Sequence, residues 1–209
     1  MDFVKAMAAG LLVAAISPQA AKAEETALQQ LQTARALYEI GVAAKDPLYI
    51  LAAAKLRKSV RMAPGGPVPE GRSPAKGAPL QWDRMLVAAD PLITGDPMLE
   101  GLAEDIRAER SKGVTNGPVY SIINLAAGGK DLYPDVPFSG GQYAEIYVEG
   151  PRGSDLNLLV HDSRGRLVCS DTDISAIAYC GWRPASDDAY AITVVSEGGR
   201  GGSYSLMTN

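Results

Sequence analysis

The hydrophobic pattern of the chain changes its period once, near residue 117, and this change limits the folds that the chain can adopt. From Glu24 to Gly117 alanine and leucine recur at helical spacing, whereas from Pro118 onward apolar and polar residues alternate among many glycines. Helical spacing predicts packed helices, and alternation predicts strands with one buried face. The pattern therefore predicts an α+β protein with separate domains, which are helical hairpins over residues 24–117 and an antiparallel β-sandwich over residues 118–209.

Charge divides at the same position. The helical part carries 12 basic and 12 acidic residues, and the strand part carries 6 and 11. The net negative charge therefore lies in the strand part, which argues against nucleic acid as a partner. One basic cluster, KLRKSVR at residues 55–61, ends a predicted helix. We interpret it as a solvated helix end that complements the helix dipole, because no aromatic residues interleave with it to stack on bases.

The first 23 residues have the pattern of a secretory signal peptide. A short charged head is followed by an apolar run too short to span a membrane, and the segment ends at Ala21-Lys22-Ala23. Cleavage after Ala23 predicts a mature chain without a membrane span, located in the periplasm or secreted. In such a compartment two cysteines are expected to pair.

Two helical hairpins are predicted in the first part. Asp46-Pro47 is typical of a helix N-cap followed by proline at the first helical position, and the second hairpin breaks within ADPLITGDP at residues 89–97. Residues 45–57 and 95–107 share Asp, Pro, Ala and Arg in register, which leaves open both a short helical-repeat array and a coincidence of cap chemistry. Residues 63–79 between the hairpins are rich in Pro and Gly and predict a flexible linker.

Residues 120–209 resemble a known family. The stretches GGQYAEIYVEG, GSDLNLLVHDSRGRLVCSDTD, CGWRP and YSLMTN are similar to the bacterial pre-peptidase C-terminal domain family. The resemblance implies a small, jelly-roll-like β-sandwich that is not catalytic and is found in exported proteins. The family's recurrent D-L-D-L appears here as Asp155-Leu156-Asn157-Leu158. An amide therefore replaces one carboxylate, which weakens the case for a metal site.

The two cysteines, Cys169 and Cys180, flank a polar loop that contains Asp171 and Asp173. In an antiparallel hairpin centred between Ile174 and Ser175 the cysteines face each other, so we predict a disulfide that clamps the hairpin. A redox site more often has C-x-x-C at a helix start, and a zinc site needs ligands that a chain with one histidine does not supply.

Four aspartates, Asp155, Asp162, Asp171 and Asp173, lie at predicted strand ends. They predict a calcium site if the strand ends converge, because calcium takes six to eight oxygen ligands. The alternative is that they form turns by bonding to the local backbone. No other cofactor is predicted.

The sequence offers no catalytic constellation. Its one histidine, His161, is predicted on the outer side of a strand, without the context of a nucleophile. We therefore predict a non-enzymatic, exported binding or assembly module whose partner is another exported or envelope protein. The alternative is an accessory or inhibitor-like factor of a secreted hydrolase that docks on the enzyme or its substrate through the sandwich.

Overall fold

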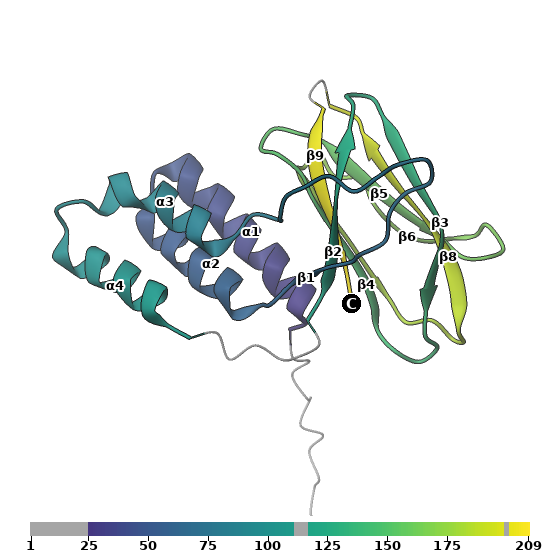
Figure 1. The fold of residues 1–209 in the computed structure, drawn as a ribbon, viewed down its shortest axis with the longest axis horizontal. Helices are drawn as coiled ribbons and strands as arrows, with labels where there is room; N and C mark the ends of the chain where they lie inside the picture. The colour runs from purple at the N-terminus through teal and green to yellow at the C-terminus, as the bar shows by residue number, and fades with distance from the viewer. Residues whose placement is uncertain (1–24, 111–116, 199–200) are drawn as a thin grey trace, which may run out of the picture.

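The computed structural model describes residues 25–110, 117–198 and 201–209. A layer of helices lies beside a pair of β-sheets (Figure 1). The predicted signal peptide, residues 1–23, lies outside the described residues. No helix in the described ranges is long and apolar enough to cross a membrane. The helical part consists of α1 (Ala27–Ala44), α2 (Pro47–Ser59), the two-residue strand β1 (Ala63–Pro64), α3 (Trp82–Ile93) and α4 (Pro97–Ala108).

Each helical hairpin turns at an Asp-Pro pair. Asp46 accepts a hydrogen bond from the backbone N–H of Leu48 in α2, and Asp96 accepts hydrogen bonds from the N–H groups of Met98 and Leu99 in the first turn of α4. Proline follows each aspartate at a position where no helical N–H is needed. These caps confirm both predicted helix starts. Helix α3 extends through Pro91 to Ile93 and so ends within the predicted break at residues 89–97, with Pro91 in its last turn.

The strand part forms two sheets. One has the order β1-β2-β9-β4-β7 and the other the order β3-β8-β5-β6, and all pairs are antiparallel except β1 with β2. The strands are β2 (Val119–Leu125), β3 (Lys130–Phe138), β4 (Ala144–Glu149), β5 (Leu156–His161), β6 (Leu167–Asp171), β7 (Ile177–Trp182), β8 (Asp188–Ser196) and β9 (Gly202–Thr208).

Alternate side chains of both sheets fill one core between them. Leu158 of β5 and Ile192 of β8 meet Ile146 of β4 and Leu206 of β9, and all four are fully buried. An aromatic group closes one end of the core, since the ring of Trp182 lies 4.9 Å from Phe138 and 5.1 Å from Tyr190. This arrangement confirms a β-sandwich of antiparallel-rich sheets.

Strand β4 is buried on both faces, although its alternating sequence predicted only one buried face. Its outer face carries Tyr147, which packs with Met207 of β9 against Leu28 and Leu31 of α1. The helices therefore cover the outer face of this sheet. The division into two separate domains at residue 117 remains a prediction, but the two regions share a buried apolar contact.

The predicted flexible linker is held on the sandwich by hydrogen bonds, and this is a correction. Residues 63–80, which we call the strap, cross one side of the sandwich and return to α3 (Figure 1). Backbone N–H groups of the strap donate hydrogen bonds to β2 and β3. The sequence correctly indicated few apolar residues. The strap is attached to the sandwich by main-chain hydrogen bonds and one arginine instead of by apolar side chains.

Candidate functional site

The disulfide between Cys169 and Cys180 is present, with the two Cα atoms 5.9 Å apart. Its predicted geometry was wrong, because β6 and β7 do not form a hairpin. Strand β6 pairs with β5 at the edge of one sheet, and β7 pairs with β4 at the edge of the other. Cys169 and Cys180 have the spacing of facing residues in a hairpin, but the same spacing also fits a connection that crosses from one sheet to the other. The disulfide therefore joins the edges of the two sheets.

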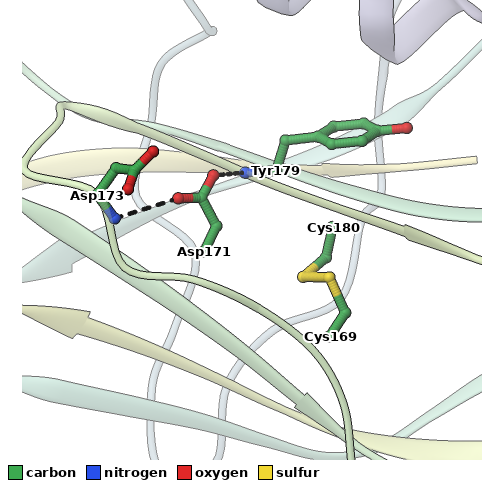
Figure 2. Close-up of a disulfide and its surroundings, with 5 residues drawn as sticks. All are labelled: Cys169, Asp171, Asp173, Tyr179 and Cys180. Carbon is green, nitrogen blue, oxygen red and sulfur yellow. Dashed lines mark hydrogen bonds between the residues drawn. A yellow bond between two sulfur atoms is a disulfide. The ribbon is translucent and has the colours of Figure 1, made fainter.

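Asp171 braces the connection beside the disulfide (Figure 2). Its Oδ2 accepts the backbone N–H of Tyr179 at 2.8 Å, and its Oδ1 accepts the N–H of Asp173 at 3.3 Å. One carboxylate thus holds both the start of β7 and the turn that leaves β6. Hydrogen bonds from backbone N–H groups to a carboxylate are stronger than those between neutral groups.

Residues 172–176, which we call the bridged loop, are also tied to the neighbouring connection between β4 and β5. The carbonyl of Ser175 accepts the N–H of Leu156, and the carbonyl of Ala176 accepts the N–H of Gly150, both at 2.8 Å. The tip of the loop has no such cover. Ile174 is 91% exposed, the highest value among the large hydrophobic residues described. The bridged loop therefore exposes an isoleucine to solvent, while the disulfide and these hydrogen bonds hold its two ends.

A groove of about 460 Å³ adjoins the bridged loop. Ile174 and Ile177 form one wall, α1 forms another, and the connection from β4 to β5 completes it. An ion pair crosses from the sandwich to α1 here, with Arg152 Nε 2.6 Å from Glu39 Oε2. The groove thus combines apolar and charged walls, and it lies where helices and sandwich meet.

The four aspartates predicted as calcium ligands are not gathered. Within the described ranges, no group of three or more His, Cys, Asp and Glu residues could hold a metal ion. Asp162 is occupied at the β5–β6 turn, where it accepts hydrogen bonds from Arg164 and Arg166. The hydrogen bonds from Arg166 lower the pKa of Asp162. The carboxylate of Asp171 likewise serves the local backbone. The Oδ1 atom of Asp155, in contrast, is buried and accepts no hydrogen bond within the described residues. The placements of Asp162 and Asp171 support the turn-forming interpretation.

The basic cluster at residues 55–61 is a solvated helix end only in part, which is a second correction: Lys55 and Arg61 are exposed, but Arg57 and Lys58 are buried. Arg57 is fully buried, and its guanidinium lies 2.8 Å from Oε2 of Glu149, whose Oε1 lies 2.8 Å from Arg35. Burial alone would lower the pKa of Arg35, but the charges of Glu149 and Glu39 raise it. Three buried charged groups from α1, α2 and β4 therefore fix the helices to the outer face of the sheet.

The neighbouring Lys58 points toward the second helical hairpin. Its ammonium group donates to the carbonyl oxygens of Ile106 and Arg107 at the end of α4, at 2.5 and 2.9 Å. It also lies 4.1 Å from the centre of the Trp82 ring on α3. Consecutive residues of α2 thus bind the sandwich and the second hairpin, and these two cations are not available to a nucleic acid.

Sequence reasoning missed Ile174 and the Glu149 pairs. A single large apolar residue inside the polar run SDTDIS is a signal that could have identified Ile174. Nothing in the strand sequence distinguishes a carboxylate that faces water from one that faces an arginine of a covering helix. The packing of the helices had to be known first.

Comparisons with known proteins give weak matches only. No family model matches the chain, and no curated protein does. The pre-peptidase C-terminal domain of a collagenase from Bacillus anthracis matches with a TM-score of 0.35 and 16% identity, over 45% of this chain and 89% of that chain. A mitogen from Yersinia pseudotuberculosis matches with a TM-score of 0.33 and 12% identity, over 44% and 85%. The C-terminal CBM6 of a laminarinase from Zobellia galactanivorans matches with a TM-score of 0.29 and 14% identity, over 43% and 80%.

Proposed function

We propose that the protein is an exported, non-enzymatic binding module that binds another exported or envelope protein through the bridged loop. One observation carries the proposal: Ile174 is 91% exposed at the tip of a loop that a disulfide, a carboxylate and two backbone hydrogen bonds hold in place. Ile174 is the anchor, and it inserts into an apolar pocket of the partner.

The energetics favour such an anchor. Burying an isoleucine side chain contributes about 1.5–3 kcal/mol relative to leaving it in water. Much of that gain is lost when a loop must become ordered on binding, and a loop that is already fixed avoids this cost. The adjacent groove, with Arg152 and Glu39 at its wall, supplies a charged rim around the anchor. Interfaces commonly combine a buried apolar anchor with a polar rim.

Export agrees with the cysteine chemistry. Both cysteines are paired, and disulfides persist in oxidising compartments. The disulfide therefore supports the proposed location of the mature protein, in the periplasm or outside the cell.

The alternative is an accessory or inhibitor-like factor of a secreted hydrolase. The location of the bridged loop favours it, because Ile174 lies on the sandwich and not on the helical layer. The helical surface is another candidate binding surface for an exported or envelope protein, since Leu48 of α2 and Met98 of α4 are 57% and 76% exposed.

Photo-crosslinking tests these roles. A photoreactive amino acid is placed at position 174 or, for comparison, at position 98 in the exported, disulfide-bonded protein, and crosslinked peptides are identified by mass spectrometry. We expect position 174 to crosslink to one exported protein, at residues around an apolar pocket. A secreted hydrolase as the crosslinked protein selects the alternative, and crosslinks from position 98 only contradict the role of the bridged loop.

A substitution pair measures the anchor with the partner so identified. Ile174→Asp should weaken binding by about 10-fold or more, as expected for loss of a buried isoleucine. The matched control is Val87→Asp on α3, which also replaces an exposed apolar side chain, 61% exposed. Equal affinity of the two variants for the partner contradicts the proposal.

A further inference from the structure

The strap occupies the side of the sandwich opposite to the disulfide. Strands β2 and β3 lie there: β3 is the edge strand of its sheet, and β2 would be the edge strand of the other sheet without β1 of the strap. Strap residues form β1 beside β2, and the N–H groups of Gly65 and Gly66 both donate to the carbonyl of Tyr120, at 3.1 and 2.9 Å. Further along, Ala75 N–H donates to β2 and Glu70 N–H donates to β3, at 2.7 and 2.8 Å. The strap therefore binds β2 as an added strand over the two residues of β1, and single main-chain hydrogen bonds attach its remaining length to β2 and β3.

One side chain adds specificity to these main-chain contacts. Asp131 of β3 is only 2% exposed, and its Oδ1 lies 2.9 Å from Arg72 Nε of the strap. Its Oδ2 accepts a hydrogen bond from the Tyr204 hydroxyl at 3.0 Å, and that hydroxyl lies 2.7 Å from the hydroxyl of Tyr133. A buried carboxylate needs a cation or several donors. Here the cation comes from the strap, whose Arg72 side chain remains 41% exposed.

The strap is otherwise poorly packed. Of its residues 63–80, only Pro69 and Pro79 are buried. A cleft of about 540 Å³ remains between strap residues 65–68 and residues 133–137 of β3. The strap is therefore held by backbone hydrogen bonds and one ion pair, with little apolar burial to resist its exchange.

We infer that the β2–β3 side is a strand-addition site for an extended, arginine-bearing segment of another protein, and that the strap of this chain fills the site in the absence of that segment. Binding by strand addition takes affinity from main-chain hydrogen bonds and specificity from side-chain pockets. Asp131 is the specificity pocket, and a carboxylate pairs well with the donors of an arginine. The inference concerns the side opposite to the bridged loop, so it stands or fails independently of the proposed function.

The site also requires a glycine in its occupant. A Cβ atom built on Gly66 would lie 2.7 Å from the carbonyl carbon of Tyr120, closer than real contacts allow. The matching segment therefore carries glycine where the backbone meets Tyr120 and arginine six residues later, as Gly66 and Arg72 do. The same geometry supplies a way to displace the strap, because Gly66→Val forces it away from β2.

The test uses the full chain and a fluorescein-labelled synthetic peptide of residues 62–80, with binding measured by fluorescence anisotropy. We expect the peptide to bind the Gly66→Val variant at least about tenfold more tightly than the wild-type protein, whose site is filled. The same peptide with Arg72→Ala, or the same protein with Asp131→Asn added, should lose about tenfold in affinity. Gly101→Ala is the matched control, because the space around that helical glycine is open, and it should behave as wild type.

Folding of each variant is checked by near-ultraviolet circular dichroism. If Gly66→Val does not fold, Arg72→Ala serves instead, because it frees Asp131 without adding volume. Equal peptide binding by wild type and the displaced variant, or no dependence on Arg72 of the peptide, overturns the inference. A concentration-dependent dimer of the displaced variant that excludes the peptide also overturns it, since the occupant would then be a second copy of this chain.

Discussion

The two open sides of the sandwich are closed in different ways. On one side a covalent bond joins the edge strands β6 and β7, and on the other the strap lies along β2 and β3. An unpaired edge strand is a template for pairing with another chain, so both sides need protection. The disulfide side keeps its shape and can present a preformed anchor. The strap side is protected by a segment that can be exchanged.

The energies of the two closures differ accordingly. A disulfide that closes a short loop contributes about 2–4 kcal/mol, in part by restricting the unfolded chain. A backbone hydrogen bond contributes about 0.5–1.5 kcal/mol net, and the strap bonds lie among exposed residues. Segments with few buried apolar contacts open at a lower free energy than the rest of a fold. The strap is therefore expected to open locally while the sandwich stays folded.

The largest expected effect comes from the helical layer, which is fixed to the outer face of one sheet by buried ion pairs. Arg57→Ala leaves Glu149 buried with only Arg35, and removing one partner of a buried ion pair costs about 3–5 kcal/mol. We expect a corresponding fall in the free energy of unfolding, measured by urea denaturation. Arg57→Met combined with Glu149→Gln should recover part of this loss. If Arg72→Ala in the strap lowers the free energy of unfolding by as much as Arg57→Ala, the strap is attached as firmly as the helical layer and the comparison fails.

Removal of the disulfide should have the next largest effect. Cys169→Ser with Cys180→Ser should lower the free energy of unfolding by about 2–4 kcal/mol, because the unfolded chain regains the freedom of the closed loop. Thermal denaturation followed by circular dichroism measures the change, and the helical signal should persist below the transition. Reduction of the wild-type protein serves as the control. Native thiols that react with an alkylating reagent before reduction would contradict the closure of this side.

Arg72→Ala should destabilise the protein by less, about 1–2 kcal/mol, because solvent screens an arginine that is 41% exposed. The double variant with Asp131→Asn should be more stable than Arg72→Ala alone, since an amide needs no cation. Unfolding in urea measures both. If the change in the free energy of unfolding of the double variant equals the sum of the changes in the two single variants, Arg72 does not act on Asp131.

The smallest effect on stability is expected from the ionisation of a single buried tyrosine at alkaline pH. Burial raises the pKa values of Tyr133 and Tyr204 above the ordinary value of 10.0, so the folded protein retains protons that the unfolded chain loses. Stability is therefore complete below pH 10 and falls as the pH rises above it, by about 1 kcal/mol per tyrosine between pH 10 and 11. Tyr133→Phe should flatten this fall, and Tyr49→Phe, an exposed control, should not. An unchanged slope for Tyr133→Phe would argue against burial of that hydroxyl.

Local patterns predicted the elements of the fold well. The Asp-Pro caps, the alternating strands of the second part and the pairing of Cys169 with Cys180 all follow from residues close in sequence or from compartment chemistry. The contacts between elements were not predictable in this way. The burial of Arg57 and Lys58 depends on Glu149 and on the end of α4, which lie far away in the sequence.

The strap shows a second limit of sequence reasoning. Pro- and Gly-rich composition correctly indicated little apolar packing, but composition does not register main-chain hydrogen bonds to an edge strand. The crossing of the cysteine connection between sheets was missed for a related reason. A hairpin and a sheet-to-sheet crossing have the same residue spacing, and only the pairing partners β5 and β4 distinguish them.

Hydrogen–deuterium exchange of the native full chain tests the difference between the two sides most directly. The amides of Glu70 and Ala75 in the strap are compared with those of Gly150 and Leu156, which donate to the bridged loop. We predict that the strap amides exchange about 100-fold faster, because they open without the rest of the sandwich, and that reduction of the disulfide accelerates exchange only at Gly150 and Leu156. Strap amides that exchange as slowly as those of the bridged side would contradict the account.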